Sequence, residues 1–125
     1  MVGTAGNLRK EEDERQEADL LERVRIIAER RVERYQYLPA EMFGEPAWDM
    51  LLDLYLASGD GKSISVSSAC IASRAPATTA LRWLRRMEQL GLVARVNDDN
   101  DRRRVYVTIT DAAKRALTDW LLSIR

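Results

Sequence analysis

The sequence has no histidine and a single cysteine, Cys70. Histidine is the commonest general base and metal ligand near neutral pH, and one cysteine cannot form an internal disulfide, which fits a reducing compartment. The chain also lacks a glycine-rich phosphate loop, a metal-ligand cluster and a nucleophile beside a base. We therefore expect no catalytic residues, no metal site and no cofactor, and we interpret the protein as not being an enzyme.

Long apolar runs are absent as well. No stretch approaches the roughly 20 residues that span a bilayer, and the N-terminus lacks the apolar core of a signal peptide, so we expect a cytoplasmic protein without membrane contact.

The net charge is zero, which argues against a non-specific polybasic binder. The charge is nevertheless uneven, because residues 74–104 hold eight arginines and four acids, whereas residues 37–73 hold one lysine and five acids. This asymmetry indicates one face suited to an anionic partner.

The N-terminal third of the chain is predicted to be a long helix. With 125 residues, 46% of them apolar, the chain should form one domain with an extension. Residues 1–7 show no periodicity and are expected to be disordered. Residues 8–36 contain no glycine or proline and are rich in helix-forming residues. The second half of this helix carries an apolar stripe at helical spacing, made of Leu20, Leu21, Val24, Ile27, Ala28, Val32 and Tyr35.

Two interpretations of this stripe are open. It can pack on the chain's own domain, or it can form a dimerisation surface. We favour the dimerisation helix, because so long an element exceeds what a small core can cover and because symmetric homodimers are the commonest oligomers.

A second helix is predicted over residues 47–57. Pro46 opens it, and its residues are apolar nearly all round, so it should be the most buried helix. Its Trp48 and Tyr55 are interpreted as core residues, although an aromatic-lined effector pocket at the junction with the first helix is the alternative.

A short strand and a short helix come next. The strand is predicted over residues 62–65, where it would pair with a later hairpin, and the helix over 66–73, with Ser65 or Ser67 as its N-cap. Cys70 is interpreted as a core thiol, since no neighbouring group would lower its pKa.

The stretch from residue 76 to 110 organises the rest of the chain. A helix is predicted over about 76–90, with an apolar face of Ala80, Trp83, Leu84 and Met87 and a polar face of Thr78, Thr79, Arg82, Arg85 and Arg86. Two strands, at residues 92–96 and 105–109, flank a charged loop of about 97–104 that ends in Arg102, Arg103 and Arg104. A last helix is capped by Thr110 or Asp111 and runs to about Ser123.

A basic helix followed by a hairpin with a basic arm outlines a winged helix-turn-helix domain over residues 46–125. The expected fold class is mainly α with a small β-hairpin wing (α+β). A helix fits the major groove of double-stranded DNA, where base edges are distinguishable, and a wing arginine can reach a phosphate or the minor groove. We expect the hairpin arm to be irregular through Arg103, because strict alternation from Val105 would turn Arg103 into the core.

Over roughly residues 46–118 the chain resembles the multiple-antibiotic-resistance regulator (MarR) family of transcription factors. The matching motifs are Leu90-Gly91-Leu92-Val93, Asp101-Arg102-Arg103 and Val107-Thr108-Ile109-Thr110-Asp111. The resemblance implies a homodimer that places recognition helices in successive major grooves and wing arginines in the minor groove. It leaves a small aromatic effector that releases the DNA as an open alternative. By match, Thr78, Thr79, Arg82 and Arg86 face bases or phosphates, and Arg103 is the wing arginine, oriented by Asp101.

Three features depart from the family's pattern. Arg74 stands where such turns often have glycine, residues 75–77 lack the usual polar helix cap, and the chain ends early, which shifts the expected dimer role to the N-terminal helix. The favoured function is a dimeric, sequence-specific DNA-binding regulator of transcription, since a basic stripe and a matching motif are independent signs. The alternative is a winged-helix protein-interaction or regulatory module without its own specific DNA site, which the zero net charge and the acidic helices support.

Overall fold

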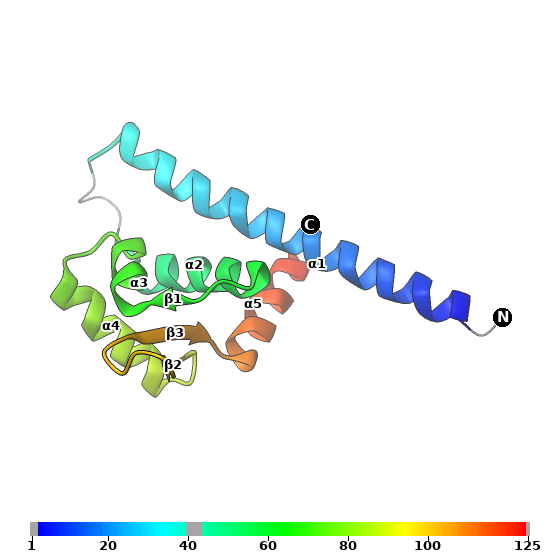
Figure 1. Ribbon diagram of the computed structural model, residues 1–125. Coiled ribbons are helices and arrows are strands. Elements are labelled where there is room, and N and C mark those ends of the chain that lie inside the picture. Colours follow the sequence, from blue (N-terminus) through cyan, green and yellow to red (C-terminus); the bar gives the residue numbers. More distant parts are fainter. Residues whose placement is uncertain (1–2, 40–43, 125) are drawn as a thin grey trace.

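The computed structural model describes residues 3–39 and 44–124 and is mainly helical, with one small sheet, as the sequence predicts. The elements in chain order are α1 (Gly3–Glu33), the short 3-10 helix η1 (Arg34–Gln36), α2 (Pro46–Asp60), β1 (Ile64–Ser65), α3 (Val66–Ala72), α4 (Ala77–Gln89), β2 (Val93–Asn97), β3 (Val105–Ile109) and α5 (Asp111–Ser123). Figure 1 shows α1 as a rod across one side of the domain, with α4 and the sheet on the other side. None of the described helices combines the length and the apolar character needed to cross a membrane.

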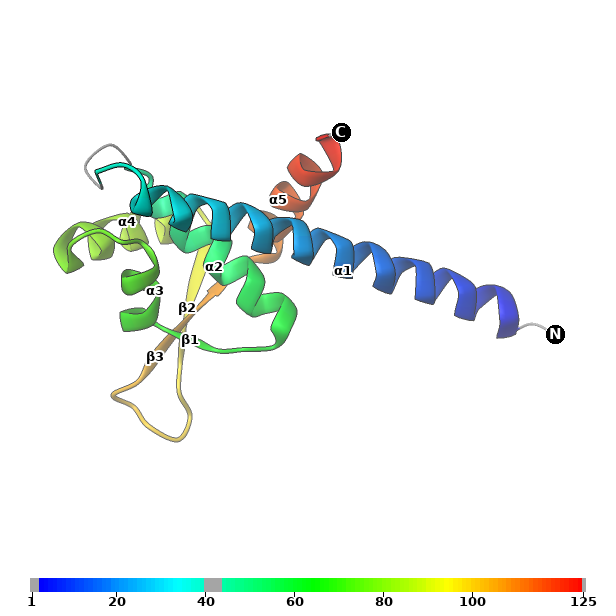
Figure 2. The same cartoon turned by 90° about the horizontal axis from the view of Figure 1, so that it is seen from above.

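Helix α1 begins earlier than the sequence predicts. It already includes residues 3–7, so the expected disorder is wrong for them, while residues 1 and 2 lie outside the described part. Two glycines in this stretch cost about 1 kcal/mol each, which is too little to stop a helix that no proline interrupts. The N-terminal half of α1 projects beyond the domain in both views (Figures 1 and 2).

Most of the apolar stripe of α1 packs on its own chain. Val24 is 0% exposed and Leu20 is buried beside it in the common core. Leu21 lies directly on Gly59 of α2, where an added Cβ atom would overlap its side chain. Own-domain packing therefore accounts for these residues, and Leu20 and Val24 are not available to a partner in this arrangement. A dimer contact through α1 needs another face of the helix.

Helix α2 lies at the centre of the domain, in contact with α1, α3, α4 and β3. Met50, Leu52, Leu54, Tyr55 and Ala57 are buried, which confirms that this is the most buried helix. The hydroxyl group of Tyr55 forms a hydrogen bond with Thr118 Oγ1 at 3.0 Å, so this core phenol ties α2 to α5.

The sheet has the order β1-β3-β2, and all pairs are antiparallel. The ladder between β2 and β3 ends at the pair Asn97 and Val105, and beyond it Asp98 N–H donates to the carbonyl of Arg104 at 3.1 Å. This confirms that regular pairing begins only after Arg104. The predicted caps are also in place, because Ser65 accepts from the N–H of Ser68 at the start of α3 and Thr110 accepts from the N–H of Ala113 at the start of α5.

Candidate nucleic-acid interface

Helix α4 has one buried and one exposed side. Ala80, Leu84 and Met87 are buried against the core. The opposite side carries five exposed polar side chains at helical spacing, namely Thr78, Arg82, Arg85, Arg86 and Gln89, while Thr79 is half-buried at its margin. Gln89 is the one member of this side that was not predicted from the sequence. The signal was present, because Gln89 lies seven residues after Arg82 and hence on the same face.

Trp83 does not belong to the core face of α4, contrary to the sequence-based prediction. Its side chain is 42% exposed, and Leu90 at the end of the helix is exposed as well. Trp83 sits at the edge of the apolar stripe, and a side chain at an edge is buried only if a neighbouring element covers it. No element does so among the described residues, so α4 has an apolar margin beside its basic face.

The turn between α3 and α4 is tightly constrained. Arg74 has a φ of +58°, in the left-handed region that favours glycine. The buried hydroxyl of Ser73 donates to the carbonyl of Cys70 at 2.5 Å and accepts from the N–H of Ala75 at 3.1 Å. These bonds fix the direction in which α4 starts.

Cys70 belongs to the core, as predicted. Its side chain is buried, and this burial raises the pKa of the thiol, although Arg95 lowers it in part. A thiol with a raised pKa is a poor nucleophile, which fits a packing role.

The wing loop presents its arginines to solvent. Asp101 Oδ1 accepts from the backbone N–H of Arg103 at 3.0 Å and lies 3.5 Å from Arg103 Nε. The Arg103 side chain is nevertheless 95% exposed, so its guanidinium extends away from the protein. Arg102 is exposed too. A hydrogen bond with Tyr106 raises the pKa of Arg104, and the nearby charges of Asp101 and Asp98 add to this effect.

Short local bonds shape the tip of the wing. Asp98 accepts from the N–H of Asn100 at 2.9 Å and from the hydroxyl of Tyr106 at 3.4 Å. At the base of the wing, Arg103 and Arg104 line an open hollow of about 520 Å³ together with Ser65 and Ser67 from the start of α3. In Figure 1, α4 and the loop between β2 and β3 both lie on the side of the domain turned away from α1. The two basic features predicted from the sequence therefore share one side of the molecule.

Arg95 is an additional charged residue at this side that was not predicted from the sequence. Its Nε lies 3.3 Å from Glu88 Oε2, which joins β2 to the end of α4. The ion pair partly offsets the negative charge of Glu88 at the end of α4.

A helix-turn-helix followed by a two-stranded wing defines a winged helix-turn-helix domain. No family model matches the sequence, and no curated protein matches it. Solved structures do match the fold. The Staphylococcus aureus MepR–DNA complex aligns with a TM-score of 0.54 and 18% identity over 96% of this chain and 81% of that chain.

Two further structures have the same fold. Bordetella bronchiseptica BpsR, whose DNA binding is regulated by 6-hydroxynicotinic acid, aligns with a TM-score of 0.51 and 21% identity over 94% of this chain and 70% of its own. The heme sensor PefR from Streptococcus agalactiae, in complex with heme, aligns with a TM-score of 0.52 and 23% identity over 82% of this chain and 72% of its own. The chain spans 64% of a mutant MepR from a multidrug-resistant clinical isolate, somewhat less than two thirds of that protein. Because the sequence identities are all below 25%, the structural similarity establishes only the fold of this chain, which is a winged helix.

Proposed function

We propose that this protein is a cytoplasmic, homodimeric regulator of transcription that binds double-stranded DNA at a specific sequence, without enzymatic activity. The observation that carries the proposal is the exposed side of α4, where Thr78, Arg82, Arg85 and Arg86 lie opposite a buried face. The loop between β2 and β3, which carries the 95% exposed Arg103, lies on the same side of the domain in Figure 1. The likeness of the fold to MepR, which was solved in complex with DNA, supports the same function.

Each polar residue of this side has a role in the proposal. Arg82 is at the centre of the exposed face of α4, from which an arginine can donate two hydrogen bonds to O6 and N7 of a guanine in the major groove. Thr78 and Thr79, one turn earlier, contact bases or phosphates. Arg85 and Arg86 contact phosphates at the groove edges, with Arg86 Nη1 near Gln89 Oε1 at 3.3 Å.

The wing completes the interface. Arg103 enters the minor groove and Arg102 contacts the backbone. The bond from Asp101 limits the rotamers of Arg103, so binding costs that side chain little conformational entropy. A narrow minor groove has an enhanced negative potential, which favours an extended guanidinium.

Dimerisation involves α1 and α5 in this proposal. Residues 6–19 of α1 are exposed and project from the domain (Figure 2). A helical segment of this length is only marginally stable in water when it makes no tertiary contacts. Arg23 Nη2 donates to the carbonyl of Ile124 at 3.1 Å, where α1 meets the end of α5. Near this junction Ile26, Leu122 and Ile124 are exposed. We assign the interface to this apolar surface rather than to the buried Leu20 and Val24.

The dimer can be tested with one charged substitution. Ile26→Glu should give a monomer by light scattering, because Ile26 is 46% exposed within the chain and its substitution leaves the core intact. Ile71→Glu on α3, where the side chain is 78% exposed, is the matched control and should remain dimeric. If Ile26→Glu is also dimeric, the interface lies elsewhere.

The DNA-binding proposal is tested by footprinting the purified full chain on genomic fragments, beginning with its own promoter. Protection of a defined site is the expected result. The logarithm of the affinity should fall linearly with the logarithm of the salt concentration between about 50 and about 200 mM. Equal binding to all fragments would exclude a specific operator.

The second candidate is a winged-helix protein-interaction module. The exposed Trp83 and Leu90 beside the basic face of α4 support it, because aromatic and apolar side chains are enriched in protein interfaces. Trp83→Ala leaves DNA affinity unchanged if DNA is the partner. Absence of any protected site at low salt would favour the module.

A further inference from the structure

The hollow at the base of the wing brings together charged and polar side chains from separate parts of the chain. The junction of β1 and α3, the strand β2 and the loop before β3 all contribute to it, through Ser65, Ser67, Arg95, Asp101, Arg103 and Arg104. Three arginines thus face one acid in its lining. The excess of positive charge favours an anion as the occupant.

The arginines of this hollow differ in how far their charges are already neutralised. Arg104 forms no ion pair with any described residue, although Asp98 and Asp101 lie close enough to stabilise its charged form. Arg95 is only partly exposed, and its Nε lies 3.3 Å from Glu88 Oε2. Arg104 therefore supplies the least neutralised charge, while Arg95 connects the hollow to the end of α4.

The two serines have different roles at this hollow. The hydroxyl of Ser65 is occupied by the start of α3, because it accepts from the N–H of Ser68 at 3.1 Å and donates to Ser68 Oγ at 3.0 Å. The hydroxyl of Ser67 is exposed and has no hydrogen-bond partner within the described part of the chain. Ser67 can therefore donate to a ligand, and serine hydroxyls and arginines are common donors to phosphate oxygens.

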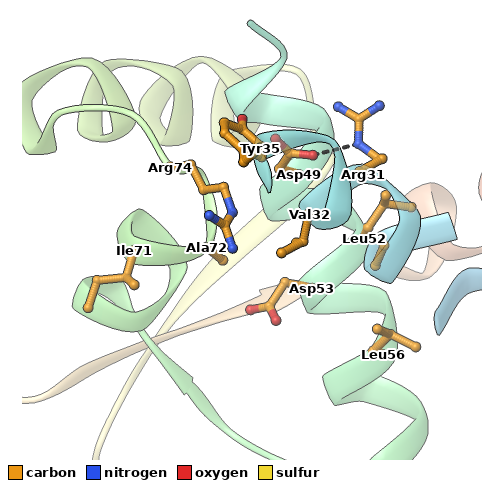
Figure 3. Close-up of a pocket in the computed structure, with 11 residues that line it drawn as sticks. Arg31, Val32, Tyr35, Asp49, Leu52, Asp53, Leu56, Ile71, Ala72 and Arg74 are labelled. Carbon is orange, nitrogen blue, oxygen red and sulfur yellow. Dashed lines mark hydrogen bonds and ion pairs between the residues drawn. The ribbon is translucent and has the colours of Figure 1, made fainter. Parts of the chain in front are cut away.

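A second cavity, of about 250 Å³ between α1, α2 and α3 (Figure 3), has no such excess of positive charge. Its charged lining consists of two arginines and two acids, Arg31, Arg74, Asp49 and Asp53. The guanidinium carbon of Arg74 stacks over the ring of Tyr35, at 4.9 Å from its centroid. The aromatic residues considered for an effector pocket lie elsewhere, since Tyr55 is in the core and Trp48 packs edge-to-face on Trp120 at 5.4 Å. The hollow of the wing is thus the better site for an anion.

We propose that the hollow at the base of the wing holds a phosphodiester group of the DNA backbone, between Ser67 on one side and Arg95 and Arg104 on the other. This assignment rests on the proposed DNA-binding function and adds three residues that lie outside α4 and the tip of the wing. Phosphate contacts fix the register of a protein on the duplex. Because Arg95 is also paired with Glu88, the phosphate fixes the wing and the end of α4 relative to each other.

The first test needs no DNA. Inorganic phosphate is titrated into the isotope-labelled full chain, with the ionic strength held constant by sodium chloride, while backbone amide signals are followed by NMR. The amides of residues 65–67, 95 and 103–105 should shift and saturate. Ser67→Asp should weaken this binding at least about fivefold, because two like charges about 4 Å apart repel each other even in water. Absence of a saturable shift at these amides would overturn the proposal.

Ser63→Asp is the matched control, because it adds the same charge at an exposed serine of the same segment that does not line the hollow. It should bind phosphate as the unsubstituted protein does. An equal loss in both variants would mean that the added charge acts at a distance and that Ser67 does not touch the anion, which contradicts the proposal.

The second test measures DNA affinity by fluorescence anisotropy over a salt series. Ser67→Asp should weaken binding at least about fivefold and lower the salt slope by about 1, because one phosphate contact is lost, whereas Ser63→Asp should stay within about twofold. Unchanged DNA affinity in Ser67→Asp, together with phosphate binding, would show that the hollow takes free anions only and would overturn its assignment to DNA. If the unsubstituted protein protects no DNA, the footprint shows that the proposed function fails, and the phosphate titration still reports on the hollow separately.

Discussion

Asp101 holds Arg103 at two points, since its Oδ1 accepts from the backbone N–H of Arg103 at 3.0 Å and lies 3.5 Å from the guanidinium Nε. The acid thus orders both the backbone and the side chain of an arginine that is otherwise surrounded by solvent.

Arg103→Ala should weaken DNA binding on all sequences and lower the salt slope by about 1, because one phosphate-type contact is lost. Asp101→Ala should weaken binding too, although it removes a negative charge close to DNA. Fluorescence anisotropy over a salt series measures both effects.

The matched control is Asp99→Ala, which removes the same charge from the same loop at an exposed residue with no side-chain bond to Arg103. Binding by this variant should be unchanged or slightly tighter. If Asp101→Ala also binds more tightly at low salt, the acid only repels phosphate and does not orient Arg103.

Substitution of Arg82 should affect sequence preference. Arg82→Ala is expected to cost about 1–3 kcal/mol on the specific site and to flatten the preference at one base pair, because a bidentate contact with guanine is lost. Anisotropy on the specific site, on single-base variants and on random DNA gives the comparison. An equal loss on all of these would make Arg82 a phosphate contact.

Because α1 packs on its own chain, substitution of a buried residue of this helix should lower stability by an amount that does not depend on protein concentration. Leu20→Ala should lower the free energy of unfolding by about 2–5 kcal/mol, because a buried leucine is replaced by a cavity. Urea denaturation should give the same loss at every protein concentration. Leu8→Ala, at an exposed leucine of the same helix, should change stability by less than about 0.5 kcal/mol. A loss for Leu20→Ala that fades at high protein concentration would point to a dimer contact instead.

Because the backbone at Arg74 is left-handed, alanine and glycine at this position should affect the stability of the fold differently. Arg74→Ala loses the contact with Tyr35, worth about 0.5–1 kcal/mol, and keeps the unfavourable φ of +58°. Arg74→Gly loses the same contact but removes that strain, so it should be more stable than Arg74→Ala by about 1–2 kcal/mol. Equal urea midpoints for the two variants would show that the conformation is not strained.

Asp53 should destabilise the fold once it is ionised. Because burial raises its pKa in the folded state above the ordinary value of 3.8, the folded chain binds more protons than the unfolded chain as pH rises through this range. Stability is therefore lost with rising pH until the folded-state pKa has been passed, and it stays lower above that point. Asp53→Asn should be more stable than the unsubstituted protein at pH 7 and equally stable below about pH 3.8. Urea denaturation at several pH values measures the difference, and a variant that is less stable at pH 7 would contradict it.

Most elements of the winged domain could be predicted because their signals are local. Thr110 and Ser65 cap the helices that follow them, and the charged loop before Val105 sets where strand pairing begins. The polar side of α4 also follows from helical spacing alone. The proposed DNA-binding surface therefore follows largely from the side-chain periodicity of α4.

The sequence by itself determined which segments are helices and strands and which face of α4 is basic, because hydrogen bonding within a helix and side-chain periodicity depend on near neighbours. Only the tertiary structure decided that Leu20 and Val24 are covered by the chain's own core, that Trp83 lies at an uncovered edge and that Asp53 faces a cavity without a partner among the described residues. Burial of a side chain depends on what packs against it from distant parts of the chain, and a one-dimensional pattern does not specify which apolar surfaces meet.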